Sequence, residues 1–119
     1  CKWVEDVLVD VINMTKEKME KYYDEHVTDT MCRNELYKKY YMDTIIEDTS
    51  AVAGLELIRR IVGMANVKDI TTIADEAKRA RAEKICITAA IDFIKNRSDK
   101  KCGKCFLKTL KDAIAEVDA

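Results

Sequence analysis

The residues best suited to binding chemistry form the segment Ile58-Arg59-Arg60-Ile61-Val62-Gly63. Adjacent residues on a helix project about 100° apart, so Arg59 and Arg60 do not serve one site in the same way. Arginine holds phosphates and hydroxyl groups through a fork of N–H donors. Two interpretations are open: a solvated pair that favours the helix dipole near a C-terminus, or a guanidinium placed to bind a phosphate or a sugar hydroxyl.

Glu56 is the acid best placed to pair with one of these arginines. Arg60 follows Glu56 by four residues, the favourable spacing for an acid–base pair on a helix. Arg59 has no acid four positions before it and lies at the edge of the expected apolar stripe. The spacing therefore predicts that Glu56 pairs with Arg60.

The segment before the arginines must present them, and it is rich in small residues. A helical wheel predicts a buried face of Ala51, Leu55, Ile58 and Val62, with Ile61 and Ala65 beside it. Gly54 costs about 1 kcal/mol of helix propensity relative to alanine, which suggests a packing or functional reason, or a kink. The residues with almost no side chain would let another backbone or a ligand approach closely: Ser50, Ala51, Ala53 and Gly54.

Cys102-Gly103-Lys104-Cys105 is the only metal-type or redox-type spacing in the sequence. A zinc site needs four ligands, and the chain has neither a second CxxC nor paired histidines. A thioredoxin-like motif should follow a strand, and none is predicted. We expect a polar loop over residues 98–104 with incidental thiols; a redox-sensitive pair and half of a shared metal site are the alternatives. Five cysteines without a disulfide framework favour a reducing, cytoplasmic setting.

A complete active site is not evident in the sequence, so no catalytic or metal-binding residue is assigned. There is no glycine-rich phosphate loop or Ser-His-Asp set. His26 has no obvious partner and is expected to be a surface or half-buried residue. Glu47 and Asp48 are adjacent and so face different ways on a helix. The tyrosines are expected in the core or at its edge: Tyr22, Tyr23, Tyr37, Tyr40 and Tyr41.

Composition predicts an all-α fold, a bundle of four to five helices. Proline is absent, glycine occurs three times and 36% of the 119 residues are charged. A net charge of −1 gives no support for nucleic-acid binding, and no apolar run approaches the ~18 residues of a membrane span.

Apolar periodicity and capping residues set the expected helices. The first covers residues 2–27, and the second starts within 31–34 and breaks or kinks at 48–50, where Asp, Thr and Ser compete with helical hydrogen bonds. Gly63 should close it, before a connector over 64–73 with one short turn. Asp75 should cap a largely buried helix reaching about residue 97, and a last helix should cover 106–117.

Over residues 2–98 the chain resembles the S-methyl-5-thioribose kinase family. The most specific match is Ile58-Arg59-Arg60-Ile61-Val62-Gly63. Asn66 stands where the family usually has histidine, Glu76 stands where it often has proline, and the CGKC segment looks like an insertion. The remaining matches are Glu47-Asp48-Thr49, Ala53-Gly54, Ala65, Val67, Asp69, Ile73, Asp75, Arg79 and Ala80.

The resemblance implies a protein-kinase-like fold related to choline and aminoglycoside kinases. The family transfers the γ-phosphate of ATP, with magnesium, to the 1-hydroxyl of methylthioribose in methionine salvage. Its catalytic and metal motifs lie upstream and match nothing here, so residues 1–119 are expected to be the C-terminal helical part of a larger kinase domain, inactive alone. The resemblance places Arg59 and Arg60 on the substrate side, and we expect Arg59→Ala to lower kcat/KM about tenfold or more, and Arg60→Ala less if Glu56 is its partner.

The alternative is a stand-alone helical interaction or scaffold module without catalysis. As a kinase fragment, the chain would have the upstream kinase lobes and methylthioribose as its partners. A fragment cut from a larger domain should also expose apolar helix faces and tend to self-associate, for example as a homodimer.

Overall fold

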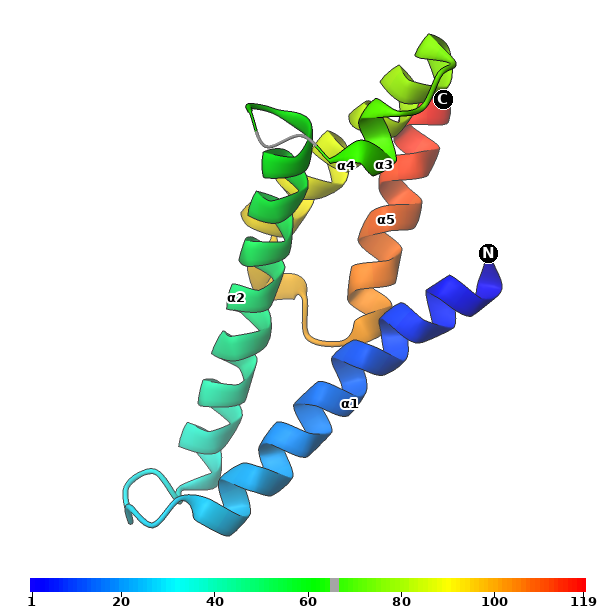
Figure 1. The fold of residues 1–119 in the computed structure, drawn as a ribbon. Helices are drawn as coiled ribbons and strands as arrows, with labels where there is room; N and C mark the ends of the chain where they lie inside the picture. Colours follow the sequence, from blue (N-terminus) through cyan, green and yellow to red (C-terminus); the bar gives the residue numbers. More distant parts are fainter. Residues whose placement is uncertain (65–66) are drawn as a thin grey trace.

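The computed structural model describes residues 1–64 and 67–119, and within these ranges the chain is all-α (Figure 1). Ala65 and Asn66, which the sequence analysis placed beside the apolar stripe and at a histidine position, lie outside the described residues. The predicted fold class is confirmed. The helices are α1 (Lys2–His26), α2 (Glu35–Ile61), α3 (Lys68–Thr71), α4 (Glu76–Lys95) and α5 (Gly103–Asp118), with a 3₁₀ turn, η1 (Arg97–Asp99), before α5.

The helices form an elongated molecule with extents of 57 × 31 × 22 Å. Helix α2 packs along α4, and α5 packs against both α4 and α1. Helices α1 and α2 meet at the 27–34 connection and diverge from it (Figure 1). Helix α1 therefore packs mainly against α5 and less against α2. Within residues 1–64 and 67–119, no helix combines the length and apolar composition needed to span a membrane.

Polar side chains cap the starts of α2 and α4, and α2 begins at Glu35, just after the predicted range of 31–34. Asn34 accepts hydrogen bonds from the backbone N–H groups of Leu36 and Tyr37 at the start of α2. Asp75 accepts from Ala77 and Lys78 at the start of α4. Each cap satisfies N–H groups that have no partner within the helix. The predicted Asp75 cap is confirmed.

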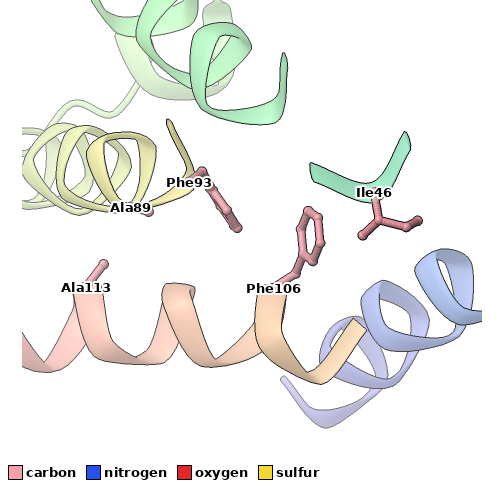
Figure 2. Packing of buried hydrophobic residues seen from close by; sticks show 5 residues of the cluster. All are labelled: Ile46, Ala89, Phe93, Phe106 and Ala113. Atoms are coloured by element: carbon pink, nitrogen blue, oxygen red, sulfur yellow. The ribbon is translucent and has the colours of Figure 1, made fainter. Parts of the chain in front are cut away.

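The core lies where α2, α4 and α5 meet. The Phe93 and Phe106 rings are tilted against each other with centroids 5.3 Å apart. Figure 2 shows both rings in the space between the helices, with Ile46 of α2 beside Phe106. Ala89 and Ala113 complete the buried cluster, and their small side chains let α4 and α5 approach each other closely.

Helix α2 runs unbroken through Asp48–Ser50, so the predicted break is wrong. The hydroxyl groups that were expected to compete with the helical hydrogen bonds donate to backbone carbonyls instead. Thr49 Oγ1 donates to the Ile45 carbonyl at 2.8 Å, and buried Ser50 donates from Oγ to the Phe93 carbonyl of α4 at 2.8 Å. Because these bonds leave the main-chain ladder intact, the helix continues.

The buried face of α2 also differs from the predicted one. Leu55 and Val62 are 58% and 60% exposed, whereas Gly54 and Ser50 are buried. Helix α4 packs on the side of the small residues, and a Cβ at Gly54 would fall 2.7 Å from the Ala90 carbonyl oxygen. The close approach of another backbone, one of the two roles expected for the small residues, is confirmed.

The surface of α1 and the start of α2 carries many exposed apolar and aromatic side chains. The tyrosines expected in the core are mostly exposed, and that prediction is wrong: Tyr22, Tyr37, Tyr40 and Tyr41 are exposed, and Tyr23 is half-buried. The reason is that α1 and α2 diverge and leave each other's apolar stripes largely uncovered. No residue of α1 is fully buried, and the expected exposure of apolar faces is confirmed.

Candidate functional site

The twin arginines lie on the last turn of α2, where the chain changes direction. The last helical hydrogen bond of α2 runs from the backbone N–H of its C-cap residue, Val62, to the Ile58 carbonyl at 2.8 Å. Gly63 follows with φ 105°, a conformation that side-chain-bearing residues rarely adopt. The chain then reaches α3, which packs against α4. Gly63 therefore closes α2, as predicted, and α3 is the short turn predicted in the connector.

Arg59, not Arg60, binds Glu56. Arg59 Nη2 lies 2.7 Å from Glu56 Oε2 and its Nε lies 3.1 Å from Oε1, a forked pair one helical turn apart. The hydrogen bond from Arg59 lowers the pKa of Glu56 below its usual value. The predicted Glu56–Arg60 pair is wrong, because the three-residue spacing also brings side chains together and here gives both carboxylate oxygens a partner.

Arg60 instead lines a hollow between α2, α3 and α4. The hollow has a volume of about 290 Å³. Among the described residues, Arg60 has no carboxylate within salt-bridge distance. Asp69 is the other charged residue of the lining, and the rest is apolar: Leu57, Ile61, Val67, Ile70 and Cys86.

This arrangement can bind a small polar ligand with an apolar part. Arg60 offers N–H donors for a hydroxyl or phosphate oxygen, and Asp69 offers acceptors for hydroxyl groups. The apolar walls suit a hydrocarbon or thioether group. Burial raises the pKa of the Cys86 thiol in this lining, which keeps it protonated and apolar. Cys86 is half-buried.

The described residues hold no group of three or more His, Cys, Asp or Glu side chains that could bind a metal ion. Glu47 and Asp48 face different partners, as predicted: Glu47 pairs with Lys101, and Asp48 Oδ1 lies 3.6 Å from Arg97 Nη1. His26 is exposed and stacks on Tyr22 with ring centroids 3.9 Å apart, which agrees with a surface role.

Sequence reasoning missed a polar cluster centred on Asp92. Its carboxylate accepts hydrogen bonds of 2.6 Å from each of Lys100 Nζ, Thr109 Oγ1 and Asn96 Nδ2. Burial raises the pKa of Asp92, but these three donors outweigh it and lower the pKa from 3.8 to about 2. The spacing of Asp92 and Asn96 was visible in the sequence, whereas Lys100 and Thr109 join only through the fold.

The CGKC segment begins α5, so the loop predicted for all of residues 98–104 is wrong at its C-terminal end. Cys102 is the residue before the first turn and Cys105 lies within that turn. Their sulfur atoms are 3.2 Å apart, and both are free thiols. The backbone N–H of Gly103 donates to Asn13 Oδ1 of α1 at 2.9 Å, which joins the start of α5 to α1.

Comparisons of the sequence identify methylthioribose kinases as relatives, which confirms the resemblance. The chain is 27% identical over 110 residues to methylthioribose kinase 1 of Oryza sativa subsp. japonica, covering 81% of this chain and 25% of the relative. It is 37% identical over 62 residues to methylthioribose kinase 2 of the same organism, covering 52% and 14% of the two chains. It is 29% identical over 90 residues to the Bacillus pumilus methylthioribose kinase, covering 76% and 23%.

The chain therefore spans about a quarter or less of the length of these relatives. No family model matches the chain, and no solved structure matches it.

Proposed function

We propose that the chain is the C-terminal helical part of a kinase that phosphorylates S-methyl-5-thioribose with ATP and magnesium in methionine salvage. The similarity to methylthioribose kinases of rice and Bacillus carries this proposal. The nucleotide, the metal ion and the catalytic base belong to the part of the enzyme upstream of these residues. The 119-residue segment contributes substrate-side contacts and packs against the upstream lobes through its exposed apolar faces.

Within this function, Arg60 is the arginine that contacts methylthioribose, and Arg59 supports it. Arg59 is held by Glu56, whereas Arg60 lines the hollow of about 290 Å³ without a described acid partner. The apolar lining suits the methylthio group, and the guanidinium and Asp69 suit the sugar hydroxyls. Phosphoryl transfer depends on positioning and charge neutralisation, which an arginine supplies from a neighbouring helix. This reverses the order of importance predicted from spacing.

The test uses the full-length gene product, assayed for ADP release with ATP, magnesium and methylthioribose. ADP release that depends on methylthioribose is expected, and its absence in a folded protein overturns the kinase assignment. Arg60→Ala should lower kcat/KM for methylthioribose by roughly tenfold or more, the loss of one charge-assisted contact. Arg59→Ala should lower it less.

Arg81→Ala is the control for the loss of an exposed arginine away from the hollow, and it matches Arg59→Ala most closely because Arg81, like Arg59, pairs with an exposed acid, Asp118. Kinetics for Arg60→Ala that match those of Arg81→Ala would refute the substrate contact while leaving the kinase assignment intact. The isolated 119-residue chain should show no ADP release in the same assay, and turnover by it would refute the upstream location of the catalytic groups.

Self-association of the isolated chain, for example as a homodimer, follows from its exposed apolar faces. A monomer at high concentration in analytical ultracentrifugation would contradict it.

The cytoplasm is the proposed compartment, since all five cysteines are free thiols. The stand-alone helical module predicted as the alternative has no observation in its favour beyond these same helices.

A further inference from the structure

Two thiols that take no part in the proposed substrate site are already in contact. Cys102 Sγ and Cys105 Sγ lie 3.2 Å apart, whereas a disulfide bond is about 2.05 Å long, so closure needs a shift of roughly 1 Å. Both residues belong to one continuous stretch of backbone at the start of α5, where the Cys105 N–H donates to the Cys102 carbonyl at 2.9 Å. Bond formation therefore requires side-chain rotation and no rearrangement of helices.

The surroundings favour a reactive thiolate at Cys105. Burial raises its pKa, but a hydrogen bond from Cys102, backbone hydrogen bonds from Lys101 and Cys102 and the charge of Lys100 outweigh it and lower the pKa below the usual value. The first turn of α5 adds the positive end of a helix dipole. Cys86 is the contrast within the chain, because burial alone acts on it and raises its pKa.

Cys105 is also accessible to a small reagent. It opens onto a surface hollow of about 250 Å³. The charged groups that line this hollow are of both signs: Asp92, Asp99, Lys100, Lys108 and Asp112. Asp92 is bound by Lys100, and Asp112 is bound by Lys108, so two of the acids in this lining are themselves paired with lysines.

We propose that Cys102 and Cys105 form a reversible dithiol–disulfide pair that exchanges electrons with a low-molecular-weight disulfide. The Cys105 thiolate attacks one sulfur of that disulfide, forms a mixed disulfide and releases the first thiolate. Cys102 then loses its proton and its thiolate attacks Cys105 Sγ, which releases the second thiolate. The protein dithiol loses two electrons and two protons, and the small disulfide becomes two thiols.

Gly103 places this pair at the junction of α5 with α1. Its N–H binds Asn13, and the Val9 backbone occupies the space that a Cβ at Gly103 would need. The two sulfur atoms are already in contact while the junction between α5 and α1 is intact. We therefore expect the oxidised protein to keep its helix content. The inference is independent of the proposed kinase function, since neither thiol lines the hollow beside Arg60.

The test exposes the reduced full-length protein to oxidised glutathione and maps the products by peptide mass spectrometry. A peptide that has lost two hydrogens and links Cys102 to Cys105 is the expected product, and circular dichroism should stay unchanged. Cys102→Ser should stop at a glutathione adduct on Cys105, because the second attack is removed. Cys86→Ser is the matched control and should still form the Cys102–Cys105 bond.

A second measurement needs no variant. Brief alkylation of the native reduced protein should label Cys105 at least about tenfold faster than Cys86. Equal labelling rates, or oxidation that joins other cysteines and leaves Cys102 and Cys105 reduced, would overturn the proposal.

Discussion

Gly54 of α2 lies directly against the backbone of Ala90 on α4. A Cβ built on Gly54 would fall 2.7 Å from the Ala90 carbonyl oxygen and 2.7 Å from Ile94 Cγ1. The same face carries Ser50, whose hydroxyl donates to the Phe93 carbonyl. The two small residues thus let α2 and α4 pack backbone to backbone, and this contact supports the helix end on which Arg59 and Arg60 lie.

Gly54→Ala should destabilise the protein although alanine is the better helix former. The propensity gain is about 1 kcal/mol, whereas forcing a methyl group into a packed interface costs about 1–3 kcal/mol. The midpoint of urea unfolding, followed by circular dichroism, should fall. Val52→Ala, at an exposed position of the same helix, is the control and should change the midpoint little. A midpoint for Gly54→Ala at or above that of the native protein would show that α2 and α4 separate without cost.

Gly103→Ala should loosen the contact between α5 and α1. A Cβ at Gly103 would lie 2.7 Å from Val9 Cα, and backbone atoms do not move aside as a flexible side chain does. We expect a loss of about 1–3 kcal/mol and faster amide hydrogen exchange in α1, which is held mainly through α5. Lys104→Ala, at the next and exposed position, should leave the exchange of α1 unchanged. Unaltered exchange in Gly103→Ala would argue that α1 is held by other contacts.

Asp92 should make stability depend on pH in the acid range. Its folded-state pKa of about 2 lies below its ordinary value of 3.8, so the folded state favours the ionised form. This contribution is fully present above about pH 4 and is lost as the pH falls towards 2. Because the Asp92 side chain is 34% exposed, solvent screening reduces the contribution to an order of 1 kcal/mol.

Asp92→Asn should remove that acid-range loss and lower stability at neutral pH, since the Lys100 side chain is only 9% exposed and loses its counter-charge. Urea midpoints measured between pH 2 and pH 7 test this, with Asp112→Asn as the control for loss of an exposed carboxylate. Parallel curves for the native protein and Asp92→Asn would contradict the assignment.

Glu56→Gln should release Arg59 with little effect on stability, because the Glu56–Arg59 pair is on the surface. The melting temperature should stay within the scatter of replicate measurements. In the full-length protein, KM for methylthioribose should also change little if Arg60 makes the contact. A large change in KM would instead identify Arg59, held in place by Glu56, as the residue that meets the substrate.

The sequence by itself determined the helices and most of their ends. Periodicity, the Asp75 cap, the Gly63 turn and the absence of proline are local signals, because each depends on residues within one or two turns of one another. These signals predicted the all-α class and the turn after the arginines. They failed at Asp48–Ser50, because the Ser50 hydroxyl, which could have competed with the helical hydrogen bonds of α2, donates to the Phe93 carbonyl of α4.

Only the tertiary structure decided which face of α2 is buried and that Lys100 and Thr109 meet Asp92. The Glu56–Arg59 pair is local to α2, but the sequence offers Glu56 two arginines at suitable spacings and does not select between them. A helical wheel offers more than one apolar or small-residue face, and the neighbour that packs there selects between them. Leu55 is more apolar than Gly54, yet α4 packs against the face that carries Gly54 and Ser50, because small residues on a helix face permit the closest approach of a neighbouring backbone. The hollow that Arg60 lines also depends on how α2, α3 and α4 pack, and no spacing along the chain encodes that packing.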